Sequence, residues 1–228
     1  MNADMAHPAG DPQPSSLAAR TVTASVAAPV VLGVVYLGSP YFDILVAIMA
    51  LILAFEWNRL CAGRPGWLAL GGIYIAVPSW ALLHLRADST AGAVIVFWML
   101  AVVWSADTGA YAFGRLIGGV KLAPVISPNK TWAGLLGGVG AAGVTGALAG
   151  VILEVEAIPA LAGWSALIGA ISQIGDLAES WVKRHFGVKD TGAILPGHGG
   201  LFDRVDGLLV AVVAVAVLGT FGQGTILT

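Results

Sequence analysis

The feature that most constrains the fold of this sequence is a series of apolar runs, each long enough to cross a lipid bilayer. About 30 Å of hydrocarbon requires roughly 20 mostly apolar residues in a helix. Seven segments meet this rule, approximately 19–38, 41–58, 66–85, 91–114, 132–153, 158–183 and 206–223. Only 11% of the 228 residues are charged, which does not suit a water-exposed globular surface. We therefore expect an all-α, polytopic integral membrane bundle of about seven transmembrane helices.

The distribution of Lys and Arg predicts how this bundle is oriented. Basic residues near the ends of spans are retained on the cytoplasmic side of a membrane. With seven spans and a cytoplasmic N-terminus, ten of the 11 basic residues fall on that side and only Arg86 falls on the other. The loops 115–131 and 184–205 then lie together at the cytoplasmic surface.

Residues 1–17 precede the first run and are rich in Pro, Ala, Ser and Asp. They have no hydrophobic period, so we expect a short disordered tail. Asp4 and Asp11 make a cleaved secretory signal a poor explanation of the run that follows. Residues 18–228 are expected to form a single transmembrane domain.

The fifth apolar run is rich in small residues, which let helix backbones approach closely in lipid. It contains GxxxG spacings at Gly134–Gly138 and Gly146–Gly150. In a run with so many glycines this spacing is a weak signal for a dimer interface. We therefore predict packing within the monomer.

Composition argues against two classes of function. The formal net charge is -2, and no basic patch stands apart from acidic neighbours, so no nucleic-acid partner is expected. Cys61 is the only cysteine, which excludes an internal disulfide and a cysteine-based metal cluster.

Charge is concentrated in the segment Gly175–Gly207. This segment holds nine charged residues, counted over both signs, while the whole chain has 11 basic and 13 acidic residues. Along the sixth run, polar side chains recur at steps of three and four, which places them on one face of a helix. They are Ser172, Gln173, Asp176, Glu179, Ser180 and Lys183. Ionisable groups in a span usually line a cavity, a pathway or a site. Glu179 and Lys183 could equally form an internal ion pair at i,i+4, whereas a functional role is favoured for Asp176.

A second polar face is predicted at the end of the fourth run. Asp107, Tyr111 and Arg115 recur there every four residues. The segment SPNKT at 127–131 follows, with a turn fixed by proline, one cation and two hydroxyls just ahead of a helix N-terminus. Such donors suit a phosphate, although the glycine frame of a Walker P-loop is absent.

A glycine-rich loop follows the sixth run. The sequence LPGHGGLFDRVDG places four glycines and a proline around His198, Asp203 and Asp206. Carboxylates suit Mg²⁺ when phosphates complete its coordination shell. A helix cap explains one of these carboxylates, but it does not explain the two carboxylates and the glycine loop together.

These residues together form a dense pattern of about thirty positions. It reads S-x-x-K-R-x(4)-K-D, a spacer, then P-G-H-G-G-x-x-D-R-x-D, preceded by Gly175 and Asp176. The pattern resembles the signature of the phosphatidate cytidylyltransferase (CDP-diacylglycerol synthase) family. Weaker agreement extends upstream through Asp107, Tyr111 and SPNKT, so the resemblance covers roughly the second half of the chain.

The resemblance implies a Mg²⁺-dependent nucleotidyltransferase that converts CTP and phosphatidate to CDP-diacylglycerol and pyrophosphate for phospholipid biosynthesis. It also suggests a second metal ion, a homodimer, and a bacterial inner membrane with the active site at the cytoplasmic face. A lipid phosphate monoester has a second pKa near 6, so it is already a dianionic nucleophile at neutral pH. The enzyme then has to supply positioning and charge neutralisation rather than a strong base.

The resemblance also implies roles for individual residues. Metal ligands are expected at Asp176, Asp203 and Asp206. Catalytic groups, chiefly cations that neutralise the triphosphate and the lipid phosphate, are expected at Lys183, Arg184, Lys189, Asp190, His198 and Arg204. His198 is expected to contact phosphate or shape its loop rather than act as a base. Substrate contacts are expected at Asp107, Tyr111, Ser127, Lys130, Thr131, Ser180, Gly199 and Gly200.

The sequence departs from the family pattern at Ala133, and two other functions are compatible with it. Ala133 stands where the family often has an acidic residue, so any role of that side chain is absent or supplied elsewhere. A cation or proton transporter would also carry acidic residues such as Asp107, Asp176 and Glu179 within its spans. A CTP-dependent enzyme acting on another membrane lipid is a closer alternative.

Overall fold

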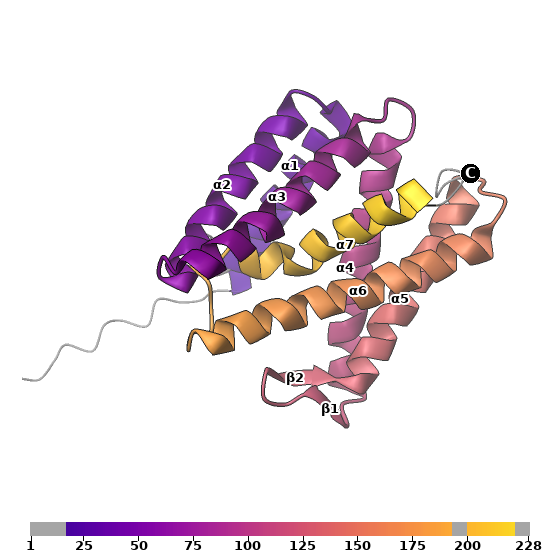
Figure 1. The fold of residues 1–228 in the computed structure, drawn as a ribbon. Coiled ribbons are helices and arrows are strands. Elements are labelled where there is room, and N and C mark those ends of the chain that lie inside the picture. The colour runs from indigo at the N-terminus through magenta and orange to yellow at the C-terminus, as the bar shows by residue number, and fades with distance from the viewer. Residues whose placement is uncertain (1–16, 193–199, 222–228) are drawn as a thin grey trace, which may run out of the picture.

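The computed structural model describes residues 17–192 and 200–221, which form seven helices and a two-stranded sheet (Figure 1). The elements in chain order are α1 (Leu17–Leu37), α2 (Tyr41–Cys61), α3 (Pro65–Ala87), α4 (Gly92–Leu116), β1 (Lys121–Ala123), β2 (Ser127–Thr131), α5 (Trp132–Ile152), α6 (Ile158–His185) and α7 (Phe202–Phe221). Each helix overlaps one of the seven predicted apolar runs. The predicted disordered tail lies outside the described residues, except for Leu17 at the start of α1.

Five helices in the described part of the chain are long and apolar enough to cross a membrane, namely α2, α3, α4, α5 and α6. The structure is therefore that of a helical membrane protein. α7 is also largely apolar, but it carries three charged residues in its first five positions. The seven-span count and the cytoplasmic N-terminus stay predictions.

Helix α5 has its small residues inside and its large apolar residues outside. Its buried positions are Gly134, Gly138, Ala142, Gly146 and Gly150. Its exposed large residues include Leu136, Val144, Leu148 and Val151. Lipid is as apolar as leucine, so helices in a bilayer associate through close packing rather than through burial of bulky side chains.

The glycines of α5 bring its backbone against both neighbouring helices. A Cβ at Gly138 would lie 2.7 Å from the carbonyl oxygen of Ala106 in α4. A Cβ at Gly146 would lie 2.8 Å from the carbonyl oxygen of Leu161 in α6. The prediction that the two GxxxG spacings serve packing within the monomer is therefore confirmed.

Helix α7 joins the N-terminal helices to the rest of the bundle. It lies between α3 and α6 and packs against both (Figure 1). Phe202 at its start is 1% exposed and stacks on Tyr74 of α3, with ring centroids 5.8 Å apart. Leu53 and Trp57 of α2 complete this apolar cluster. The first turn of α7 is thus fixed in the interior.

The segment SPNKT is a strand rather than only a turn, which corrects the all-α expectation. Ser127–Thr131 forms β2 and pairs with β1 in an antiparallel hairpin. Proline is tolerated there because β2 has a partner on one side only. Thr131 ends the strand and caps α5, since its Oγ1 accepts a hydrogen bond from Gly134 N at 3.0 Å. The hairpin and the helix therefore share one junction.

Four basic residues, Arg115, Lys130, Lys183 and Arg204, lie together around one cavity at one end of the bundle. Arg86 lies at the opposite end of α3, and its Nε donates to the carbonyl of Val35 at 2.7 Å. The 23 residues of α3 separate this end from the other by about 34 Å. The cytoplasmic location of the basic end stays a prediction.

Candidate functional site

A cavity of about 740 Å³ opens between the C-terminal parts of α4 and α6, the hairpin and the first turns of α5 and α7. It brings together nine of the residues predicted for the site. They are Asp107, Tyr111, Lys130, Thr131, Asp176, Lys183, Asp203, Arg204 and Asp206. The polar faces predicted for α4 and α6 thus line the same space.

The hairpin delivers Lys130 to the polar face of α6. Its Nζ lies 2.7 Å from Asp176 Oδ2, and the lysine side chain is 17% exposed. Ser180, one turn further along α6, donates to the other oxygen of Asp176 at 3.4 Å. Both oxygens of this carboxylate are therefore engaged.

A buried amide links this pair to α4. Gln173 Nε2 donates to Asp107 Oδ1 at 3.0 Å. The Lys130 Nζ donates to Gln173 Oε1 at 3.4 Å. Gln173 belongs to the polar stripe predicted for α6, but we did not predict it as a site residue. Its helical register, three residues before Asp176, was the signal that pointed to it.

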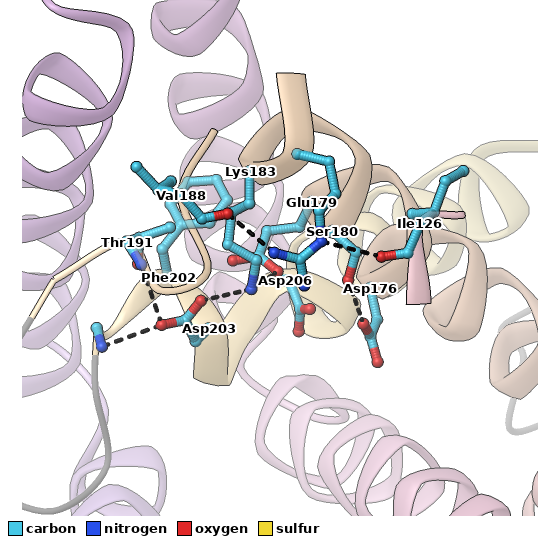
Figure 2. Close-up of polar contacts among 12 residues, drawn as sticks. Ile126, Asp176, Glu179, Ser180, Lys183, Val188, Thr191, Phe202, Asp203 and Asp206 are labelled. Carbon is cyan, nitrogen blue, oxygen red and sulfur yellow. Dashed lines mark hydrogen bonds and ion pairs between the residues drawn. The ribbon is translucent and has the colours of Figure 1, made fainter. Parts of the chain in front are cut away.

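Lys183 connects α6 to α7. Its Nζ lies 2.7 Å from Glu179 Oε2 and 2.7 Å from Asp203 Oδ1. The ion pair between Glu179 and Lys183, one of the two roles predicted for them, is confirmed. Figure 2 shows that the side chains of Lys183 and Asp203 point toward each other across the gap between the two helices.

Three carboxylates form a group that could hold a metal ion. One oxygen each from Asp176, Glu179 and Asp206 lies within 4.8 Å of the others. Glu179 is 3% exposed, and its Oε1 has no hydrogen-bond partner among the described residues. Asp203, which the resemblance implied as a ligand, is not one of these three. Like Asp176, it has a partner at each oxygen: its Oδ1 lies against Lys183, and its Oδ2 accepts from Gly200 N at 3.1 Å. Glu179, for which an ion pair and a functional role were both predicted, was not among the expected ligands.

Several predicted residues lie away from these contacts or outside the description. Arg184 is exposed and donates to the carbonyls of Ile126 at 3.3 Å and Val188 at 3.0 Å (Figure 2). Lys189 and Asp190 are exposed in the turn after α6. Ser127 begins β2, outside the cavity lining. His198 and Gly199 lie outside the described residues.

A further buried acid, Glu56 of α2, was missed by sequence reasoning. It is 1% exposed, and its two oxygens accept hydrogen bonds from the backbone N–H groups of Leu201 and Phe202 at 2.9 and 2.8 Å. A charged residue inside the apolar run 41–58 was the available signal.

The charge on the cavity wall is nearly balanced. Its carboxylates are Asp107, Asp176, Glu179, Asp203 and Asp206, and its basic side chains are Arg115, Lys130, Lys183 and Arg204. Five negative and four positive groups do not by themselves favour a free polyanion. They do favour an anion that arrives together with a cation.

Fold and site define the class of this protein: a polytopic helical membrane protein with a charged cavity, suited to a metal-bound anion, at one end of its bundle. Comparison with known proteins then shows that the chain belongs to the cytidylyltransferase family, whose model matches residues 66–221. The family resemblance predicted from the signature segment is therefore confirmed. Helices α1 and α2 precede the matched residues.

Similar proteins include several named phosphatidate cytidylyltransferase. That of Brucella suis biovar 1 (strain 1330) is 48% identical over 183 residues, which are 78% of this chain and 63% of that protein. That of Bacillus subtilis (strain 168) is 38% identical over 173 residues, 72% of this chain and 63% of that protein. That of Rickettsia bellii (strain RML369-C) is 32% identical over 217 residues, 90% of this chain and 91% of that protein. The chain thus spans less than two thirds of the first two relatives and most of the third.

Proposed function

We propose that this protein is a CTP:phosphatidate cytidylyltransferase, which condenses CTP with phosphatidate to CDP-diacylglycerol and pyrophosphate. The observation that carries the proposal is the cavity, which joins basic and acidic residues of three helices, α4, α6 and α7, and of the hairpin. Its volume of about 740 Å³ lies within the usual range for sites that enclose a ligand of nucleotide size. The names of the relatives support the same activity.

The reaction requires positioning and charge neutralisation. An oxygen of the lipid phosphate forms a bond to the α-phosphorus of CTP, and the bond from that phosphorus to the pyrophosphate oxygen breaks. The lipid phosphate is mostly dianionic at neutral pH, because its second pKa is near 6. No side chain has to remove a proton from it. Lys130 and Lys183 are placed on the wall to neutralise the phosphates of the reactants.

The carboxylates of the site fit Mg²⁺. Ligand oxygens around this ion lie about 3 Å apart when adjacent and about 4.2 Å apart when opposite. The three oxygens of Asp176, Glu179 and Asp206 lie within 4.8 Å of one another, and Glu179 Oε1 has no hydrogen-bond partner among the described residues. We therefore propose these residues as ligands. When bound, Mg²⁺ would neutralise the phosphates of CTP.

Asp203 takes a supporting part in this proposal. It holds Lys183 beside Glu179 and accepts hydrogen bonds from the backbone at Gly200 and Thr191. A role of Asp203 as the ligand of a second ion rests on the family resemblance.

The location of the site suits one lipid and one water-soluble substrate. The cavity lies at the end of the bundle where the basic residues cluster, bordered by helices that are long and apolar enough to span a membrane. We propose that this end faces the cytoplasm of a bacterial inner membrane. A homodimer is also proposed, on family resemblance.

The arrangement argues against a transport path. The core around Met99, Val102 and Ile168 holds buried serines such as Ser165 but no carboxylate over the described residues, so the carboxylates do not continue through the bundle. A cation or proton path is expected to carry ionisable groups along the length of a span.

The deciding experiment measures CDP-diacylglycerol formed from CTP and phosphatidate by the purified protein in lipid nanodiscs, with a Mg²⁺ titration. Asp176→Asn and Glu179→Gln are expected to lower the rate by about 10²-fold or more and to raise the Mg²⁺ concentration for half-maximal rate. Asp43→Asn, at an exposed position near the start of α2, is the matched control and should leave both values unchanged.

Contrary outcomes are distinct. Full activity of Asp176→Asn would remove the proposed metal site. Cation flux without nucleotide turnover would favour a transporter, and turnover of a different lipid phosphate or lipid alcohol in a substrate panel would change the substrate.

A further inference from the structure

Glu56 lies in apolar surroundings near the end of α2. It is 1% exposed and sits one turn after Leu53, beside Trp57, in the cluster that packs around Phe202. Burying a carboxylate is costly unless hydrogen bonds compensate for the lost water. In the part of the chain that the structure describes, Glu56 forms no ion pair with a basic side chain. Its compensation must therefore come from backbone groups.

That compensation is supplied by the first turn of α7. Glu56 Oε1 accepts from Leu201 N at 2.9 Å, and Oε2 accepts from Phe202 N at 2.8 Å. The preceding N–H, that of Gly200, donates to Asp203 Oδ2 at 3.1 Å. The first N–H groups of a helix have no acceptor within the helix, and negative charge is stabilised there. Three successive N–H groups are thus held by two carboxylates.

The chain is also shaped to let Glu56 approach. A Cβ on Gly200 would lie 3.0 Å from both carboxylate oxygens, and a Cβ on Gly192 would lie 2.9 Å from Oε1. Distances this short require the neighbouring group to move. Glycine at these two positions therefore allows α2 to touch the chain on both sides of residues 193–199.

The first turn of α7 also carries two carboxylates of the candidate site. Asp203 and Asp206 come one and four residues after Phe202, so any shift of this turn moves both relative to α6. Glu56 of α2 holds the N–H groups of Leu201 and Phe202 at the start of this turn. We propose that Glu56 is a positioning residue, which fixes the start of α7 and thereby sets the distance of Asp206 from Asp176 and Glu179.

This inference assigns a part in the site to a helix that precedes the matched residues 66–221. Glu56 is absent from the cavity lining, so its effect on the site passes through α7. Only the kinetic arm of its test rests on the proposed function. The structural arm is independent of any activity.

The test uses Glu56→Gln in the full chain in nanodiscs. An amide keeps the size but offers a single acceptor oxygen, so one N–H loses its partner. Hydrogen exchange at Leu201 and Phe202 is expected to become about tenfold faster relative to Val212 in the same helix. The Mg²⁺ concentration for half-maximal CDP-diacylglycerol formation is expected to rise about tenfold, the size of effect seen when groups that orient metal ligands are lost.

Leu53→Ala is the matched control, because it weakens the same cluster but keeps the carboxylate. Its effects on exchange at Leu201 relative to Val212 and on the Mg²⁺ requirement should be clearly smaller than those of Glu56→Gln. Unchanged relative exchange at Leu201 in Glu56→Gln would overturn the proposal, whatever the activity. So would a Leu53→Ala variant with the same Mg²⁺ shift as Glu56→Gln. If Glu56→Gln does not fold, Glu56→Asp is compared with Leu53→Ala in the same two measurements. The shorter side chain of aspartate moves both carboxylate oxygens away from Leu201 N and Phe202 N.

Discussion

Replacing Lys183 with Met removes a cation that two buried carboxylates share. The Nζ lies 2.7 Å from an oxygen of Glu179 and 2.7 Å from an oxygen of Asp203. The exposed fractions of the three side chains are 11%, 2% and 10%, so water cannot replace the lost partner. Methionine fills a similar volume, which leaves the missing charge as the main change.

The expected cost follows from this geometry. Removing one member of a buried ion pair costs about 3–5 kcal/mol, because a charge is left without compensation. Glu179→Gln is expected to cost less, about 1–2 kcal/mol, since Lys183 keeps its contact with Asp203. In the double variant Lys183→Met/Glu179→Gln, the Glu179 carboxylate that Lys183→Met alone leaves without a partner is no longer present. The loss of unfolding free energy in the double variant should therefore be smaller than the sum of the two single losses by about 1–3 kcal/mol.

Reversible unfolding in mixed micelles with increasing SDS, followed by tryptophan fluorescence, gives the four free energies of this cycle. Lys121→Met is the control, since the same change at an exposed position of β1 should alter the free energy of unfolding by no more than about 0.5 kcal/mol. Costs of Lys183→Met and Glu179→Gln that simply add, to within about 0.5 kcal/mol, would refute the coupling.

Three further predictions concern packing and capping, each measured as a shift in thermal midpoint in detergent. Gly138→Val should lower the thermal midpoint strongly, since its Cβ would lie 2.7 Å from a backbone oxygen of α4. Gly140→Ala should leave the midpoint unchanged, because the added Cβ meets no described atom within 4 Å. Thr131→Val should lower the midpoint by an amount that corresponds to about 1 kcal/mol of stability, because the α5 cap is lost. Thr131→Ser keeps the capping hydroxyl and should keep the original midpoint. Gly200→Ala should lower both the thermal midpoint and the activity, because its Cβ would collide with Thr191 Oγ1. Equal midpoints for Gly200→Ala and the unmodified protein would contradict this reasoning.

Most of the fold could be predicted because the bilayer restricts the choices. Spanning segments must satisfy their own backbone groups and must be about 20 residues long. The predicted run 158–183 corresponds to α6 at Ile158–His185. The hairpin was not predicted, because five residues of SPNKT carry no alternating pattern and their pairing with Lys121–Ala123 is a tertiary choice.

The candidate site was partly predictable for a similar reason. Helical spacing placed Asp176 and Lys183 on one face of α6, and the cavity contains both. The proposed metal ligands could not be chosen from spacing, because whether Glu179 or Asp203 faces Asp206 depends on how α6 and α7 cross. Glu56 was missed because its partners are backbone groups, which no side-chain pattern reveals.

The contact between Glu56 and α7 has a consequence for biogenesis. Its partners follow 145 and 146 residues later in the chain. At about 5–20 residues per second, α2 leaves the ribosome roughly 7–30 s before the start of α7 exists. During this interval the carboxylate needs other donors, and its place near the end of α2 lets it keep water. The contact that joins α2 to the start of α7 can therefore form only after α7 has been made, although α3 and α4 can already pack against each other before then.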